Sequence, residues 1–505
     1  MKIHQQTFTL FASGALLLAN STVAQTPTPQ VSSKMKALVY HEFGGPEVLR
    51  LEEVDKPVPK DNQVLVKVRG LSVNPLDWHF MEGTPYLGRP MAFGFLKPTV
   101  TQLGVDYAGI VEAVGKNIKE LKPGDEVYGN KFGAFAEYIV ATEKALALKP
   151  ASLTFEQAAS LPVAAITALQ ALRDYGKIQP GQKVLINGAS GGVGTFAVQI
   201  AKSFGAEVTG VCSGRNVDLV RSLGADRVID YTKEDFTTRP ERYDLILDNV
   251  GSQPLSGFRR VLSPRGRYVV VGGGGVNDSP WTGPLISAVK MVVAKKFAAQ
   301  EMTMMLAEIN QKDLAVLNGL IESGKVKPVI DKTYPFHQLP EAMRYLEQGH
   351  AKGKVVIQVT DNIEPLTPTT GPGTEPAGKP GPLRVAFQLI AVPLAVLILP
   401  IIAAFVLNRR FKREHPEAKS FRWGYYFSFM SIVAGLILGL FFEAGAVVVI
   451  VCGLIYGVLA WFFLQRRHWA WITLTILSFN PIAWIVNAIY LRKRWAEPAA
   501  AAVTG

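Results

Sequence analysis

A glycine cluster between an apolar strand and an amphipathic helix constrains the fold of this chain more than any other feature. The segment "KVLING" (183–188) is apolar, "ASGG" follows it, and "VGTFAVQIAKSFG" (193–205) has helical periodicity. A strand, a glycine-rich turn and a helix in this order predict a βαβ unit in a parallel sheet.

Segments of the same kind continue after the cluster. Between residues 151 and 329, apolar strands alternate with helical stretches, which predicts a doubly wound parallel sheet of the Rossmann type. Residues 35–150 instead contain short strands separated by turn residues, as a small β-barrel domain does, and residues 330–361 return to that pattern. The expected fold class is therefore α/β plus β. The strands expected after the cluster are "AEVTGVCS", "DRVIDY", "YDLILDNVG" and "GRYVVVGGG".

The C-terminal part of the chain is far more apolar than the rest. Residues 384–491 contain four apolar segments that each have roughly the 20 residues needed to span a bilayer, and a Pro/Thr/Gly-rich linker at 362–383 precedes them. Trp and Tyr cluster at the ends of these segments, which is typical of membrane interfaces. We predict a transmembrane tail of about four helices, with a buried soluble helical bundle as the alternative. The segments are 384–407, 423–442, 444–464 and 469–491.

The net charge of +12 is concentrated in this tail, where 12 Lys and Arg stand against 4 Glu after residue 383. Positive charge beside apolar segments predicts membrane flanks rather than nucleic-acid binding. Residues 1–24 have the features of a signal peptide or N-terminal anchor, whereas translation from Met35 would give a cytoplasmic enzyme. The basic loop at 409–422 favours a globular region outside the membrane, but the charges at 492–494 oppose that orientation. We expect a multi-pass membrane protein and leave the side of its globular region open.

The glycine cluster matches a dinucleotide-binding fingerprint with one departure. Ala189 occupies the position of the first glycine, and Gly191 and Gly194 occupy the second and third. Gly191 and Gly192 allow the backbone to approach phosphate oxygens, and Gly194 allows the helix to pack closely on the strand. With Val193, these residues begin a helix whose free N–H groups attract an anion. We expect the loop to bind the pyrophosphate of a dinucleotide.

The tip of the following strand indicates which dinucleotide binds. An NAD site carries Asp or Glu there to bind the ribose hydroxyls, but this sequence reads "VCSGRN", with Ser213 and Arg215 and no acid. A hydroxyl and a guanidinium can bind a 2′-phosphate that a carboxylate would repel. NADPH is therefore expected; the alternative is that Arg215 is a solvated residue at a helix start.

Several further motifs follow one another along residues 35–360. They are "VNPLDW", "LGVDYAGIVEAVG", "KPGDEVYG", "GAFAEYIV", "AASLPVAAITALQAL", "LGADRVIDY" and "GKVVIQV". Together with the glycine cluster, this order resembles the medium-chain dehydrogenase/reductases, and among them the zinc-independent quinone oxidoreductase-like branch. The resemblance implies a GroES-like catalytic domain at 35–150 and 330–361 and an NADP-binding Rossmann domain at 151–329.

Zinc alcohol dehydrogenases of this superfamily hold their catalytic metal with a Cys and a Gly-His-Glu motif. The corresponding positions here resemble Asn74 and Gly104-Val105-Asp106, which supply neither a thiolate nor an imidazole. No zinc is therefore expected. Without a Lewis acid, hydride addition to a quinone or an α,β-unsaturated carbonyl is a better expectation than reversible alcohol oxidation.

The resemblance also implies roles for single residues. Asn74 would lie near the nicotinamide, Thr167 would line the cofactor cleft, and Lys354 would reach the cofactor from the returning segment. The turns that follow the later strands would border the nicotinamide ribose. The alternative is that their glycines only allow tight turns. The other implied contacts are Ser213, Arg215 and Tyr231 at the 2′-phosphate, and Asn249, Val250, Gly272 and Gly273 at the ribose.

Tyr86 is the candidate proton donor, because it lies roughly where related enoyl reductases carry a donor tyrosine. Packing in a substrate loop is the alternative, and quinone reduction can take its protons from water. Asp77 and Asp106 are interpreted as structural carboxylates.

The sequence as a whole predicts a membrane-associated enzyme that transfers hydride from NADPH to a quinone or enone. Its expected partners are this small-molecule substrate and membrane lipid but no nucleic acid, and a homodimer is left open. Two alternatives remain: an alcohol dehydrogenase of the same superfamily, and a non-catalytic NADPH-binding membrane scaffold.

Overall fold

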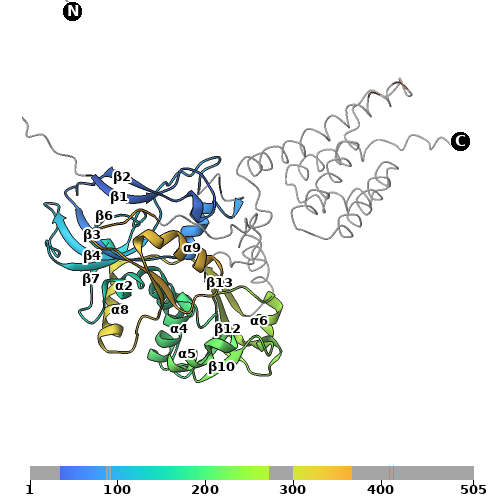
Figure 1. The fold of residues 1–505 in the computed structure, drawn as a ribbon. Coiled ribbons are helices and arrows are strands. Elements are labelled where there is room, and N and C mark those ends of the chain that lie inside the picture. The colour runs from blue at the N-terminus through green and yellow to red at the C-terminus, as the bar shows by residue number, and fades with distance from the viewer. Residues whose placement is uncertain are drawn as a thin grey trace, which may run out of the picture.

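The computed structural model describes residues 34–86, 89, 93–271 and 300–366, together with Arg409 and Arg413. Within these ranges the chain forms a β domain and a parallel α/β domain that pack against each other (Figure 1). The predicted N-terminal segment and the predicted transmembrane tail lie outside the described residues, apart from those two arginines. In the described ranges no helix combines the length and the apolar content that crossing a bilayer requires.

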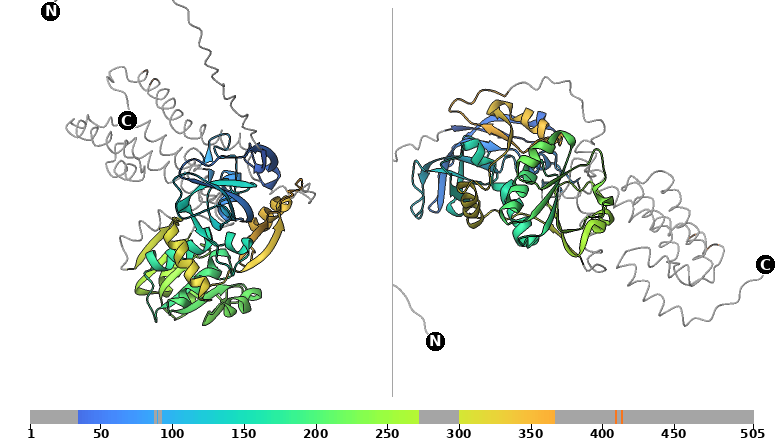
Figure 2. Two further views of the ribbon diagram at one scale, coloured as in Figure 1. Left: turned by 90° about the vertical axis from the view of Figure 1, so that its left-hand side faces the viewer. Right: turned by 90° about the horizontal axis from the view of Figure 1, so that it is seen from below.

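The β domain is built on a seven-stranded sheet around β3, in the order β14-β15-β3-β4-β5-β7 with β6 also paired to β3. Its last two strands, β14 and β15, come after the α/β domain in the chain, so a returning segment completes this sheet (Figure 2). A separate pair of antiparallel strands, β1 and β2, belongs to the same domain. The strands are β1 (Lys34–Val39), β2 (Arg50–Asp55), β3 (Gln63–Ser72), β4 (Asp106–Val114), β5 (Glu126–Asn130), β6 (Tyr138–Thr142), β7 (Leu146–Leu148), β14 (Ile330–Pro335) and β15 (Lys354–Gln358).

The α/β domain contains six parallel strands in the order β10-β9-β8-β11-β12-β13. The strand order reverses between β8 and β11, and sheets of this type bind ligands outside the carboxyl ends of their strands at such a point. The strands predicted around and after the glycine cluster are present, whereas β13 is not among the predicted ones. The strands are β8 (Lys183–Asn187), β9 (Glu207–Cys212), β10 (Arg227–Asp230), β11 (Tyr243–Asp248), β12 (Leu262–Val271) and β13 (Glu301–Met305).

Both faces of this parallel sheet are covered, as the uninterrupted apolar strands require. Along β8, Val184 and Ile186 belong to one buried cluster and Leu185 to another, because successive side chains point to opposite faces. Phe196 of α4 packs in the first cluster and Phe258 of α6 in the second. The helices are α1 (Pro75–Glu82), α2 (Phe155–Ala159), α3 (Pro162–Gln170), α4 (Gly192–Ser203), α5 (Val217–Ser222), α6 (Leu255–Val261), α8 (Gln311–Glu322) and α9 (Leu339–Glu347).

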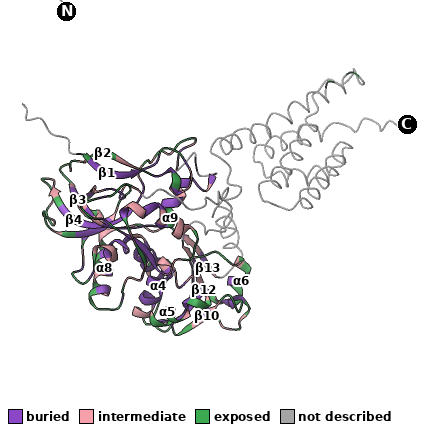
Figure 3. Ribbon diagram, in the orientation of Figure 1, coloured by how far each residue is buried: buried purple, intermediate pink, exposed green. Residues whose placement is uncertain are grey.

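The first of these clusters extends across the boundary between the two domains. Ala108 of β4 and Tyr128 of β5 are buried in it together with residues of α3 and α4. Buried stretches (purple) run through both domains in Figure 3. The Tyr128 hydroxyl also donates a hydrogen bond to Asn318 Oδ1 of α8 at 2.7 Å. Continuous apolar burial therefore fixes the orientation of the β domain on the parallel sheet.

Candidate functional site

The glycine loop joins β8 to α4 at the point where the strand order reverses. β8 ends at Asn187, Gly188 has a left-handed φ of 76°, and α4 begins at Gly192 with Gly191 as its N-cap residue. Ala189, which stands in place of the first glycine of the fingerprint, is fully buried. The loop therefore turns sharply and delivers the chain into a helix N-terminus, where unpaired N–H groups favour an anion.

The glycines of this loop serve two different needs. A Cβ at Gly194 would lie 2.0 Å from the carbonyl oxygen of Gly188, so the close packing of α4 on the loop requires glycine. A Cβ at Gly191 would meet only that same oxygen, at an ordinary 3.5 Å. Internal packing thus leaves room for a side chain at Gly191, and a glycine there leaves that space to a ligand. This arrangement fits a dinucleotide pyrophosphate.

The residues predicted at the 2′-phosphate share one edge of the parallel sheet. Ser213 follows β9 as the N-cap residue of the short helix η6 (Gly214–Asn216), and Arg215 within that helix is exposed. Tyr231 follows the neighbouring strand β10, is 58% exposed, and donates its backbone N–H to the carbonyl of Cys212. The structure thus brings all three residues to adjacent strand ends, with two of them accessible to a ligand.

Asn216 connects this edge to the glycine loop and is not among the predicted residues. Its buried amide nitrogen donates to Ser190 Oγ at 3.0 Å and lies 3.2 Å from Ser213 Oγ. An Asn before a helical segment normally indicates a helix cap. The sequence therefore gives no sign that Asn216 binds the glycine loop instead. The contact holds the tip of β9 against the loop.

A buried carboxylate shapes the turn after β11, where Asn249 and Val250 lie. Asp248 Oδ1 accepts hydrogen bonds from the backbone N–H groups of Val250 (3.1 Å) and Gly251 (3.0 Å), and its Oδ2 accepts one from the Tyr268 hydroxyl (2.7 Å). The amide nitrogen of Asn249 donates to Asn187 O at 2.9 Å. This turn therefore lies beside the carboxyl end of β8. The predicted contacts Gly272 and Gly273 lie outside the described residues.

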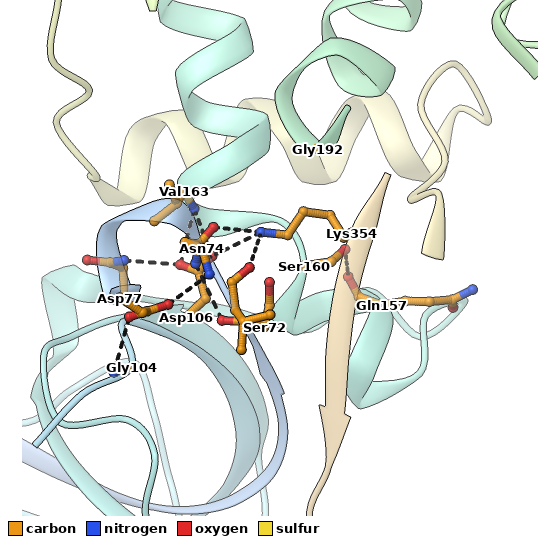
Figure 4. A network of polar contacts seen from close by, with 12 residues as sticks. Ser72, Asn74, Asp77, Gly104, Asp106, Gln157, Ser160, Val163, Gly192 and Lys354 are labelled. Atoms are coloured by element: carbon orange, nitrogen blue, oxygen red, sulfur yellow. Dashed lines mark hydrogen bonds and ion pairs between the residues drawn. The ribbon is translucent and has the colours of Figure 1, made fainter. Parts of the chain in front are cut away.

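Three buried polar side chains meet where the β domain faces the glycine loop (Figure 4). Lys354 Nζ donates to Asn74 Oδ1 at 2.6 Å, and Asn74 Nδ2 donates to Asp106 Oδ2 at 3.0 Å. Lys354 Nζ also lies 3.9 Å from Asp106 Oδ2, which makes the pair a buried ion pair. A cation and an anion on opposite atoms of one amide fix the orientation of Asn74.

Further donors stabilise the Asp106 carboxylate. Its Oδ1 accepts hydrogen bonds from Asn130 Nδ2 (3.1 Å) and from the backbone N–H of Val163 (3.2 Å) in the first turn of α3. Burial nevertheless raises the pKa of Asp106, against the lowering effects of Lys354 and these donors. Burial likewise lowers the pKa of Lys354, against the opposing charges of Asp106 and Asp77. The network is thus a desolvated ion pair whose stability depends on every partner being present.

Asp77 links Asn74 to the loop before β4. It accepts hydrogen bonds from the backbone N–H groups of Asn74 (2.8 Å) and Gly104 (3.2 Å). Its burial is the main reason that its pKa rises to about 7, with the nearby charge of Asp106 acting in the same direction. Both Asp77 and Asp106 therefore hold backbone and amide groups in place, in agreement with their interpretation as structural carboxylates.

Thr167 and Tyr86 are both buried. Thr167 lies on α3, the helix whose first turn contacts Asp106. Tyr86 is 3% exposed, and the guanidinium carbon of Arg89 lies 4.9 Å from the centre of its ring. Arg89 donates to the carbonyl oxygens of Gly83 (2.9 Å) and Glu82 (2.8 Å). Tyr86 therefore sits in a packed turn after α1, and its role as proton donor stays a prediction.

The positions that correspond to zinc ligands are occupied by the polar network and by an apolar residue. Asn74 and Asp106 bond to each other, and Val105 between Gly104 and Asp106 is buried. Among the described residues, no three His, Cys, Asp or Glu side chains are grouped as a metal site would need. Zinc independence stays a prediction that requires a chemical test.

This fold and site define a two-domain, dinucleotide-binding oxidoreductase, and the chain belongs to the medium-chain dehydrogenase/reductase superfamily, in its quinone oxidoreductase-like branch. Residues 60–151 match the family model described as the alcohol dehydrogenase GroES-like domain, and residues 223–357 match that described as zinc-binding dehydrogenase. The predicted combination of a GroES-like domain with a Rossmann-type sheet is confirmed.

Named relatives agree with this assignment. The chain is 39% identical over 356 residues to a 2-methylene-furan-3-one reductase of Solanum lycopersicum, covering 67% of this chain and 83% of the relative. It is 38% identical over 354 residues to an NADPH-dependent alkenal/one oxidoreductase, chloroplastic, of Arabidopsis thaliana, with the same coverage. The solved structure of the quinone oxidoreductase from Coxiella burnetii shares 31% identity and a TM-score of 0.58 over 65% of this chain and 100% of that chain. The chain is therefore an enzyme of the oxidoreductase class.

Proposed function

We propose that this chain is an NADPH-dependent, zinc-independent reductase that transfers a hydride to a quinone or an α,β-unsaturated carbonyl. One observation carries the proposal. The glycine loop, which fits a pyrophosphate, lies directly against the buried Lys354–Asn74–Asp106 network, since the backbone N–H of Gly353 donates to Ser190 O at 2.9 Å. A dinucleotide seated in this loop would lie next to the part of the β domain that holds these polar groups.

The choice of NADPH rests on the end of β9. Ser213 and Arg215 supply a hydroxyl and an exposed guanidinium at a position where NAD enzymes carry a carboxylate. Tyr231 adds a phenol at the neighbouring strand end. These groups can bind a 2′-phosphate by charge-assisted hydrogen bonds. Bound NADPH would supply the hydride, and the residues named here would bind and orient it.

The choice of acceptor rests on the residues that replace a metal site. Asn74, whose amide is bonded to the Asp106 carboxylate, and Val105 stand where the zinc enzymes carry a thiolate and an imidazole. These two positions therefore lack the donors with which those enzymes hold the metal that polarises an alcohol oxygen. Quinones and enones need no such activation, because conjugation already makes them hydride acceptors. The printed names of the relatives, an NADPH-dependent alkenal/one oxidoreductase and a quinone oxidoreductase among them, support this class of acceptor.

Membrane attachment is a separate part of the proposal and rests on the sequence alone. The apolar segments at 384–491 would hold the enzyme next to a membrane, where a lipophilic quinone is concentrated. Membrane fractionation of cells expressing the full chain, with and without residues 362–505, tests it. Equal recovery of both forms in the soluble fraction would reject the attachment.

The enzymatic proposal is tested with the purified full-length chain. We expect NADPH oxidation in the presence of quinones and enones, a weaker reaction with NADH, and no loss of activity after treatment with a zinc chelator. Activity on alcohols with NADP⁺ that a chelator abolishes would favour the alcohol dehydrogenase alternative. NADPH binding without turnover on any quinone or enone would favour the non-catalytic scaffold.

A further inference from the structure

Gly353 and Lys354 connect the glycine loop to the β domain through two consecutive residues. Gly353 bonds to Ser190 and also pairs with Gly191 as a parallel bridge, so its backbone is held against the loop. Its φ is 95°, and a Cβ there would lie 2.3 Å from the carbonyl oxygen of Val329. This left-handed glycine lets the chain pass the loop and enter β15.

The side chain of Lys354 continues from the loop into the β domain. A Cβ at Gly192 would lie 3.1 Å from Lys354 Cδ, so the lysine stem runs past the first residue of α4. Its ammonium lies beyond, bonded to Asn74 Oδ1 at 2.6 Å and 3.4 Å from Val73 O (Figure 4). One side chain thus contacts the predicted pyrophosphate loop with its stem and the network with its charge.

We infer that Lys354 is a positioning residue that couples the glycine loop to the amide of Asn74. The inference rests on the proposed function, in which the loop binds NADPH and Asn74 lies near the nicotinamide. Asn74 is the N-cap residue of α1, and its amide cannot turn while Lys354 holds Oδ1 and Asp106 holds Nδ2. A ligand that fixes the loop also fixes Gly353 and the base of Lys354, and therefore the Asn74 amide.

A positioning role for Lys354 predicts that its loss lowers turnover and leaves the affinity for NADPH nearly unchanged. In the full-length Lys354→Met variant, loss of a charged hydrogen bond at Asn74 is expected to lower kcat by about 10- to 100-fold. The Kd of NADPH, measured by fluorescence without an acceptor, should change by less than about threefold, because the loop and the β9 tip are intact. Lys325→Met, at an exposed lysine before β14, is the matched control and should change neither value. A Kd for NADPH more than about tenfold weaker with an unchanged kcat would show that Lys354 binds the cofactor instead.

A charge-balanced double variant distinguishes positioning from simple charge compensation. Lys354→Met alone leaves the Asp106 carboxylate buried without its cation and is expected to lower stability, whereas Lys354→Met with Asp106→Asn removes both charges. The double variant should regain thermal stability while kcat stays low, since Asn74 Oδ1 still lacks its donor. Recovery of kcat together with stability would overturn the inference. This variant also serves if the single one fails to fold.

Hydrogen exchange measures the coupling without catalysis. In the wild-type chain, NADPH should slow exchange of the backbone amides of Asn74, Leu76 and Asp77. In the double variant this protection should disappear while protection of the loop at 188–194 remains. Absence of protection at 74–77 in the wild type, or its persistence in the double variant, would overturn the coupling. If the wild-type chain binds NADPH but does not oxidise it, the proposed function is rejected. The exchange measurement would still test the coupling between the loop and Asn74.

Discussion

Lys354 Nζ donates a 2.6 Å hydrogen bond to Asn74 Oδ1 across 280 residues of the chain. The contact forms because β15 returns after the entire parallel sheet and pairs with the end of β3, where Val356 lies opposite Ser72. Asn74 follows two residues after that strand end. The strand pairing that completes the β domain therefore also assembles its buried polar network beside the glycine loop.

Alanine at Gly194 should mainly affect stability, whereas alanine at Gly191 should mainly affect NADPH binding. In Gly194→Ala the new Cβ would lie 2.0 Å from Gly188 O, a backbone atom that cannot easily move. Overpacking against a backbone atom costs about 3 kcal/mol, the upper end of the usual range, and in domains of this size should lower the Tm by about 6 °C.

Gly191→Ala is the matched control, since its Cβ would meet Gly188 O at an ordinary 3.5 Å. Its Tm should stay within about 2 °C of the wild type, because no atom has to move. Its Kd for NADPH should rise at least about tenfold, because the methyl group takes the space of a phosphate oxygen. Equal Tm values for the two variants would contradict the packing argument, and unchanged NADPH binding by Gly191→Ala would contradict the site.

Arg215→Ala should weaken NADPH binding selectively. Arg215 is exposed beside Ser213, so its loss would remove the proposed charge-assisted contact to the 2′-phosphate and little packing. The Kd of NADPH should rise about tenfold and that of NADH by less than about twofold, with stability unchanged. Arg221→Ala, at an exposed arginine of α5, should leave both dissociation constants as they are. Parallel losses for NADPH and NADH would show that Arg215 does not recognise the 2′-phosphate.

The parts of this fold that local patterns encode could be predicted from the sequence. β8, the glycine loop and α4 follow from a continuous apolar run, a turn and a helical period, all within about 20 residues. β13 could not be predicted in the same way, because its sequence "EMTMM" has neither a continuous apolar run nor several β-branched residues.

The long-range polar contacts are the other part that the sequence leaves open. Asp248 looks like any carboxylate after a strand, yet it organises the turn at Val250 and Gly251. Lys354 could be assigned to the cofactor by resemblance, but its bond to Asn74 depends on how β15 pairs with β3. Such contacts are set by tertiary packing, which no local periodicity records.

Asp77 should make stability depend on pH between about 4 and 7. Its pKa is near 3.8 for the unfolded chain and rises to about 7 in the folded protein, mainly through burial. In this window the folded state holds the proton more tightly, so the contribution of Asp77 to stability is complete below pH 4 and declines as pH rises through 7.

Asp77→Asn isolates this contribution because it cannot titrate. The variant loses one acceptor toward the Asn74 or Gly104 N–H and should be less stable at every pH. Its deficit in Tm relative to the wild type should be larger at pH 4.5 than at pH 7.5, because only the wild type is stabilised at low pH by binding a proton at Asp77. A deficit that is constant across this range, or larger at pH 7.5, would contradict a raised pKa at Asp77.

Tyr86→Phe should separate the two classes of acceptor. Hydride addition to an enone creates a carbanion or enolate that needs a proton at once, whereas a reduced quinone can take its protons from water. If the Tyr86 hydroxyl is the donor, kcat for enones should fall about 100-fold in the variant while kcat for quinones changes less than about twofold. The ring is retained, so its contact with the Arg89 guanidinium and its burial stay in place. Equal and small losses for both acceptors would assign Tyr86 to packing of the turn after α1.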